Sequence, residues 1–138
     1  MHARYLETQV LSADPIGLVE LLYAGAVDSL LQARIFLQEG RIPERSVTIS
    51  KAMQIIAELQ GSLDMEQGGE ISQGLVRLYA YMQEKLAEAN AHQARGPLEE
   101  VLNLLLILQE GWKEAALNLA RPPAVEAVPA NQTTPWRN

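Results

Sequence analysis

Apolar residues recur at alternating spacings of three and four residues in four separate stretches of the chain. That period places side chains along one face of an α-helix. The seven prolines and the clearest glycines fall between these stretches, so the pattern predicts four long helices. The predicted inner positions are, helix by helix, Ile16, Val19, Tyr23, Ala26, Leu30, Ala33 and Leu37; Ile49, Ala52, Ile56, Leu59 and Leu63; Ile71, Leu75, Leu78, Met82, Leu86 and Ala89; and Leu98, Val101, Leu105, Leu108, Trp112, Ala115 and Leu119.

Local signals predict where these helices begin and end. Asp14 is an acidic N-cap, and Pro15 follows it at the first helical position, where a missing N–H costs nothing. Gly68 and Gly69 mark a turn between the second and third helices. Because all the connections are short, neighbouring helices should be antiparallel, and we predict an all-α, up-down-up-down four-helix bundle. The helices are expected over residues 14–40, 43–63, about 71–93 and 97–121.

The two ends of the chain are expected to differ from the bundle domain, which covers residues 14–121. Residues 122–138 hold four of the seven prolines and show no apolar period, which predicts a disordered tail whose role the sequence does not reveal. Residues 1–13 are too short for a separate domain and are expected to be a mobile segment. That segment is nevertheless unusually apolar for a solvated end.

Composition excludes several classes of function. The chain has 138 residues and no cysteine, so disulfide scaffolds, thiolate zinc sites and iron–sulfur clusters are excluded. Its net charge of -6 argues against nucleic acid as a partner. The longest unbroken apolar run, residues 104–108, is far shorter than the ~20 residues of a membrane-spanning helix. Since the first residues also lack the pattern of a secretory signal peptide, we expect a cytoplasmic protein without membrane insertion.

No pattern of catalytic or ligand-binding residues stands out. Bundle di-metal sites use Glu-x-x-His motifs, and the sequence contains none; His92 is expected near an exposed helix end. Arg34 and Arg77 could line a bundle interior as in cofactor-free helical mutases, but each is flanked by apolar inner positions and is better explained as a charged flank residue. We therefore expect no catalytic, cofactor or metal site and no small-molecule substrate.

The fourth helix has more apolar residues than one inner face requires. The extra side chains either widen the core, since each helix of a bundle touches two neighbours, or form a groove for an apolar partner segment. Excess apolarity alone makes Leu102 and Leu106 candidates for contact with a partner.

Several short motifs occur in order along residues 5–115, and together they resemble one protein family. The sequence is similar to the flagellar export chaperones of the FliS type. The motifs are Tyr5-x4-Val10-x-Ser12-Ala13-Asp14-Pro15, Leu21-Leu22-Tyr23-x-Gly25-Ala26, Lys51-Ala52-x-x-Ile55-Ile56-x-Glu58-Leu59, Gly68-Gly69-Glu70-Ile71, Leu78-Tyr79-x-Tyr81-Met82, Leu86-x-x-Ala89-Asn90, Glu100-Val101 and Trp112-Lys113.

The resemblance implies an antiparallel four-helix bundle with a mobile N-terminal segment. It also implies a non-enzymatic function: binding the disordered C-terminal part of flagellin, so that flagellin does not polymerise before type III export. The flagellar export gate is a further partner that the resemblance suggests. Two other interpretations stay open, a bundle that self-associates or regulates another amphipathic helix, and a cofactor-free enzyme.

In this family the segment around the matching tyrosine is tied to flagellin recognition, so the resemblance gives Tyr5 that role. Leu6, Val10 and Leu11 would add apolar contact. The alternative is that Tyr5 only anchors the segment to the bundle. The sequence has Ala24 and Ala80 where related sequences often have aspartate, which puts any polar contact made by those carboxylates in doubt, and it has Gly111 where alanine is usual.

Overall fold

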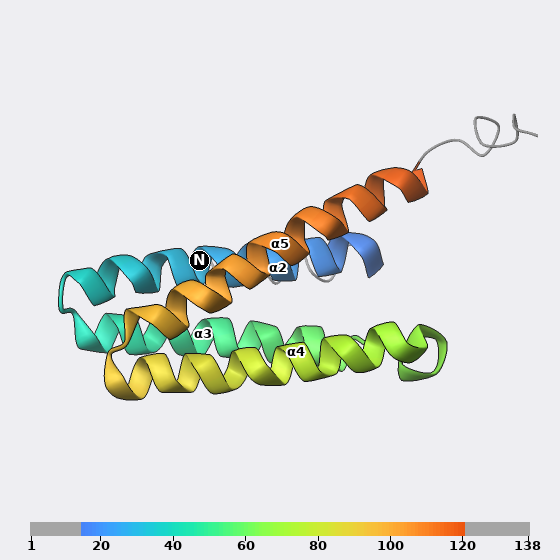
Figure 1. Cartoon of the computed structure of the whole chain (residues 1–138). Coiled ribbons are helices and arrows are strands. Elements are labelled where there is room, and N and C mark those ends of the chain that lie inside the picture. Colours follow the sequence, from blue (N-terminus) through green and yellow to red (C-terminus); the bar gives the residue numbers. More distant parts are fainter. Residues whose placement is uncertain (1–14, 121–138) are drawn as a thin grey trace, which may run out of the picture.

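The computed structural model describes residues 15–120, with side chains from 16 to 117. These residues form α2 (Pro15–Gln38), α3 (Ile42–Gly61), α4 (Met65–His92) and α5 (Arg95–Ala120) (Figure 1). Successive helices run antiparallel, and α2 and α4 each pack against both α3 and α5. The predicted all-α, up-down-up-down four-helix bundle is therefore confirmed. The terminal segments 1–13 and 122–138, predicted to be mobile and disordered, lie outside the described residues.

The two ends of the bundle differ in how closely the helices pack, and we call them the closed end and the open end. The closed end holds the turn between α2 and α3, residues 39–41, and the turn between α4 and α5, residues 93–94. The open end holds the start of α2, the connection of residues 62–64 and the last turns of α5. In Figure 1 the closed end is on the left, and α5 moves away from α4 on its way to the open end.

Both turns of the closed end use a residue with positive φ. Gly40 has φ 70°, which glycine adopts without steric cost, and the next amide, Arg41 N–H, donates to the Phe36 carbonyl at 2.9 Å. Gln93 has φ 51°, and Ala94 N–H donates to the Ala89 carbonyl at 3.1 Å. In each turn the amide after the positive-φ residue donates to a carbonyl in the last turns of the helix, and the chain reverses within two or three residues.

The start of α4, at the open end, is more irregular than the sequence predicts. The Asp64 carboxylate caps the helix by accepting from Glu66 N–H at 3.1 Å and Gln67 N–H at 3.0 Å. One helical turn forms, and the chain then bends at Gly69, whose φ of 53° and ψ of -127° lie in a region open mainly to glycine. The predicted turn at this glycine is real, and the helix after it begins about where the sequence predicts; α4 starts six residues earlier because one further helical turn precedes the bend.

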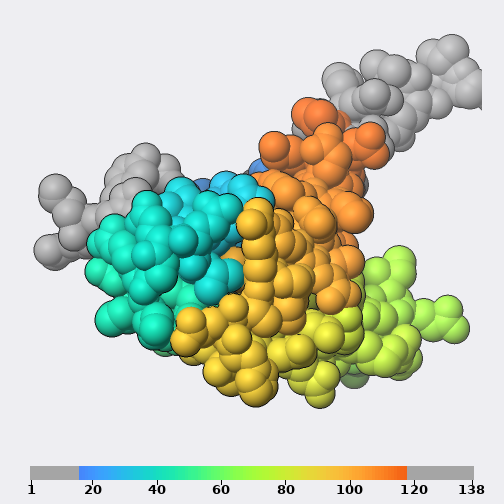
Figure 2. Space-filling model, turned by 60° about the vertical axis from the view of Figure 1, so that its left-hand side comes forward, coloured from blue at the N-terminus to red at the C-terminus, as the bar shows by residue number. Residues whose placement is uncertain are grey.

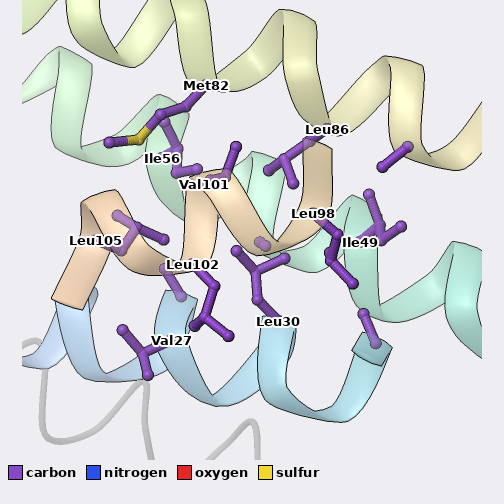
Figure 3. Packing of buried hydrophobic residues seen from close by; sticks show 14 of the residues in the cluster. Val27, Leu30, Ile49, Ile56, Met82, Leu86, Leu98, Val101, Leu102 and Leu105 are labelled. Carbon is purple, nitrogen blue, oxygen red and sulfur yellow. The ribbon is translucent and has the colours of Figure 1, made fainter. Parts of the chain in front are cut away.

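The core is built from all four helices, whose aliphatic side chains point toward one another in Figure 3. At its centre the hydroxyls of Tyr23 and Tyr79 lie 2.6 Å apart and share a hydrogen bond. These tyrosines come from α2 and α4, two helices that are diagonal in the bundle and do not pack directly on each other. Each tyrosine therefore satisfies the other's buried hydroxyl.

The predicted inner positions hold except toward the open end. In α4 the prediction is wrong for Ile71, whose side chain is 76% exposed, while Tyr79 occupies an inner position instead. In α5 the prediction is wrong for Ala115, which is exposed. The bend at Gly69 and the divergence of α5 explain both errors, because each removes a neighbouring helix that the inner face would otherwise meet.

Within the described residues, the stretch Ile16–Gln38 of α2 is long and apolar enough to cross a membrane by length and composition alone. Core helices of soluble proteins pass the same test. Here α2 buries Tyr23, Ala26 and Leu30 inside the bundle. Its apolar residues do not form one unbroken run, because Glu20 and Asp28 interrupt them.

Candidate partner-binding surface

Exposed apolar side chains occur on both α4 and α5, from about the middle of α5 to the open end. Along α5 the last buried residue is Leu105, and no later side chain up to residue 117 is buried. We call the exposed members the open-end surface: Met65 and Ile71 on α4, and Leu106, Ile107 and Leu117 on α5. Beside them lie four half-buried apolar side chains that still touch the core, Leu75, Leu78, Leu108 and Trp112.

The path of α5 explains why these side chains are exposed. In Figure 1, α5 leaves α4 and crosses toward the start of α2, and in Figure 2 its last turns stand out from the body of the molecule. The indole of Trp112 fixes this path, since its Nε1–H donates to the Ile16 carbonyl at 3.3 Å. Trp112 was predicted to be an inner residue and is only half-buried, packed against the edge of the core.

A second group of exposed apolar residues lies near the closed end, on α2 and α3: Leu31, Ile35, Ile42 and Val47. Beside it is a surface pocket of about 310 Å³, lined by Phe36, Pro43, Glu44, Val47 and Thr48. The Arg41 guanidinium lies 4.9 Å from the centre of the Phe36 ring. Arg41 also forms ion pairs with Glu39 and Glu44, so charged side chains partly cover this region.

A buried polar network holds the closed end together. Arg45 of α3 is only 3% exposed, and its Nη2 donates to the Asn90 carbonyl at 3.0 Å and to Asn90 Oδ1 at 3.1 Å. Ser46 Oγ donates to the same Oδ1 at 3.0 Å. The positive charge therefore sits against the C-terminal turn of α4, where the helix dipole favours a cation. Among the described residues no carboxylate pairs with it, and its Nε has no partner.

Charged side chains on the outer faces of the helices also form ion pairs and hydrogen bonds at this end. Glu99 of α5 accepts from Arg95 at 2.9 Å and from Arg34 of α2 at 3.3 Å, and these guanidinium groups lower the pKa of its carboxyl. The Tyr81 hydroxyl of α4 donates to Glu100 of α5, and that carboxylate raises the pKa of Tyr81.

The predicted contact residues have different outcomes. Leu102 is 2% exposed and points toward α2 beside Val27 and Leu30, so its apolarity is explained by the core (Figure 3). Leu106 is 42% exposed and belongs to the open-end surface. The four N-terminal candidates, Tyr5, Leu6, Val10 and Leu11, lie outside the described residues.

The residues considered for an enzyme are not assembled into a site. Arg34 is half-buried and paired with Glu99, while Arg77 and His92 are exposed. Within residues 16–117, no group of three His, Asp or Glu side chains is placed to hold a metal ion. The one basic side chain inside the described part of the bundle is Arg45, which was not among the predicted inner positions because it is charged, although it lies four residues before Ile49 on the same helical face.

The sequence model of the family described as flagellar protein FliS matches residues 1–119. This chain belongs to the FliS family. It is 43% identical to the flagellar secretion chaperone FliSB of Pseudomonas aeruginosa over 107 residues, which cover 78% of this chain and 85% of that protein. It is 41% identical to the flagellar secretion chaperone FliS of Salmonella typhimurium over 110 residues, 79% of this chain and 82% of the relative. It is 36% identical to the flagellar secretion chaperone FliS of Escherichia coli over 114 residues, which cover 82% of this chain and 84% of that protein.

The motifs that carried the FliS resemblance mostly make the contacts that hold the fold. Tyr23 and Tyr79 form the central hydrogen bond, and Asn90 binds Arg45. A side chain on Gly25 would meet Ile55 Cδ1 at 3.2 Å, so this glycine lets α2 and α3 approach closely. The open-end surface, in contrast, takes only Ile71 from the motifs.

Proposed function

We propose that this protein is a cytoplasmic secretion chaperone that binds the disordered C-terminal segment of flagellin and keeps it unpolymerised for flagellar export. Membership of the FliS family and the names of its relatives support a chaperone with a flagellar substrate, and they favour a binding function over catalysis. The observation that carries the proposal is the open-end surface, where five large apolar side chains remain exposed beside the core.

The chemistry of the surface suits such a cargo. A flagellin segment that would bury its apolar face against other subunits needs a substitute apolar surface while it waits for export. The diverging helices α4 and α5 offer Ile71, Ile107 and Leu117 for that purpose, with half-buried Leu108 and Trp112 beside them. A disordered segment can become helical as it docks there, and the ordering cost lowers its affinity and lets it leave again.

The N-terminal segment is proposed to take part in this exchange. Helix α2 begins at the open end, where Trp112 binds the Ile16 carbonyl. Tyr5 precedes the start of α2 by ten residues, a tether that reaches up to ~33 Å when extended. Tyr5 with Leu6, Val10 and Leu11 can therefore cover the open-end surface in the free protein and give way to flagellin.

A titration of flagellin's C-terminal segment into the protein tests the proposal, with one pair of variants for comparison. Ile107 is 68% exposed on the open-end surface, and Val47 is 67% exposed on α3. Ile107→Ala should raise the Kd about tenfold, since a well-placed apolar contact contributes on the order of 1 to 2 kcal/mol, while Val47→Ala should leave it unchanged. Absence of binding to the unaltered protein would overturn the proposed function.

A second candidate function is self-association through the apolar residues of α2 and α3, Leu31, Ile35, Ile42 and Val47, which are exposed at the other end of the bundle. Sedimentation of the cargo-free protein separates the two. A dimer that Val47→Glu dissociates, together with flagellin binding that is unaffected, would assign this second surface to self-association.

A further inference from the structure

The net charge of the described bundle is concentrated at the open end. Divided at the midpoint of each helix, the open half comprises residues 15–26, 52–78 and 108–120 and contains seven carboxylates and two cations. The other half contains seven carboxylates and six cations. The open half therefore has a net charge of -5, against -1 for the closed half, and Leu106 and Ile107 of the open-end surface lie at the boundary between the halves.

Ion pairing follows the same division. The five ion pairs of the described side chains all lie in the closed half, around Arg34, Arg41, Lys85 and Arg95. In the open half, within the part of the chain that the structure describes, Glu70, Glu110 and Glu114 have neither an ion pair nor a side-chain hydrogen bond, and all three are exposed. The two cations of this half, Arg77 and Lys113, form no ion pair with the described side chains either, so an excess of like charges that repel one another remains.

These carboxylates alternate with the apolar residues of the open-end surface. On α4, Glu70 directly precedes Ile71. On α5, Ile107, Glu110 and Glu114 are separated by three and four residues, which places them on one side of the helix. An apolar surface bordered by carboxylates complements a segment whose apolar face is bordered by lysine or arginine.

We infer that the open-end surface selects an amphipathic cargo segment with basic residues beside its apolar face, and that the unpaired carboxylates set how fast it binds. This inference rests on the proposed function, because it describes the cargo of the same surface. The apolar residues supply the contact area, and the carboxylates attract a cationic segment over distances near the Debye length, ~8 Å at physiological ionic strength. A bound cationic segment also reduces the mutual repulsion of the carboxylates.

Two triple variants with the same net charge test the inference. Glu70→Gln, Glu110→Gln and Glu114→Gln remove three carboxylates from the open half, and Asp28→Asn, Glu84→Gln and Glu88→Gln remove three from the closed half. At low salt, the open-half triple variant should bind flagellin's C-terminal segment with an association rate constant about tenfold lower than the unaltered protein. The closed-half triple variant should stay within about twofold, and salt should slow association of the unaltered protein most.

Designed peptides separate this inference from the proposed function. One peptide has an apolar helical face flanked by lysines, and its match has glutamates at the same positions. The lysine peptide should bind the unaltered protein more tightly than the glutamate peptide, and the open-half triple variant should remove that preference. If the open-half triple variant loses the preference for the lysine peptide while flagellin's segment fails to bind the unaltered protein, the proposed function is wrong and the inference stands. If flagellin's segment binds both triple variants at equal rates with no salt dependence, the inference is wrong.

Discussion

The closed and open ends of this bundle are made from the same four helices but differ in how they use apolar and charged residues. At the closed end Leu86 and Leu98 are completely buried, Arg45 binds the end of α4, and opposite charges are paired across the outer faces. At the open end Ile71 and Leu117 remain exposed, and carboxylates stand without partners among the described residues. One end is therefore built for stability, and the other keeps apolar surface available for a partner.

The largest expected difference between the ends is in the cost of removing a leucine side chain. Leu98→Ala, at a position with 0% exposure, should lower the free energy of unfolding by about 3 to 4 kcal/mol. Leu108→Ala, only half-buried beside the open-end surface, should cost about 1 kcal/mol, because water already reaches the site. Denaturant unfolding of both variants provides the measurement. Equal losses would show that the open end is packed as tightly as the closed end.

A smaller effect is expected from the bend at the start of α4. Gly69→Ala forces a side chain into a backbone conformation that only glycine adopts easily, and it should cost about 2 kcal/mol. Gly74→Ala is the matched control, since a methyl group there meets no atom within 4 Å inside a regular helix. It should stabilise the protein by about 0.5 to 1 kcal/mol. If both substitutions stabilise the protein, the bend is not needed in the folded state.

The sequence predicted the closed end better than the open end, and packing explains the difference. An inner face read from spacing assumes that each helix has both neighbours along its whole length. That assumption holds near Ile49, Leu86 and Leu98, which are buried as predicted. It fails at Ile71 and Ala115, where α4 bends and α5 diverges, because spacing along one helix does not say where its neighbour leaves.

The candidate site was harder to predict than the fold. Excess apolarity in the fourth helix could not distinguish Leu102, which points into the core, from Leu106, which is exposed. Leu106 follows Leu102 by four residues, little more than one helical turn, so only the location of α2 decides which side chain is covered. Spacing places Arg45 on the inner face, four residues before Ile49, but it does not reveal the partner that makes burial of this charge possible, because Asn90 lies 45 residues away in the sequence.

A still smaller effect on stability is expected at the centre of the bundle, between the closed end and the open end. Tyr23→Phe removes one partner of the hydrogen bond between Tyr23 and Tyr79 and leaves a buried hydroxyl unsatisfied, at a cost of about 1 to 2 kcal/mol. Tyr81→Phe removes an exposed hydroxyl from Glu100 and should change stability by less than about 0.5 kcal/mol. Similar losses for the two variants would contradict the central role of the buried pair.

The same pair predicts a dependence on alkaline pH. Burial raises the pKa of Tyr79 and Tyr23 above the ordinary value of 10.0. The unfolded chain then loses these protons first, so the stability that the pair contributes is complete below pH 10 and falls as the pH rises further. Thermal unfolding from neutral to strongly alkaline pH measures the fall, and Tyr23→Phe should make it shallower.

The smallest effect on stability is expected from the ion pairs, although all five ion pairs of the described side chains lie in the closed half. Arg34→Gln removes a partly exposed guanidinium 3.3 Å from Glu99, which keeps its shorter contact with Arg95. Exposed pairs contribute little, so the loss should be below about 0.5 kcal/mol and should vanish at high salt. Denaturant unfolding at low and high salt measures it. A loss of several kcal/mol would mean that charge pairing, and not buried apolar contact, distinguishes the closed end from the open end.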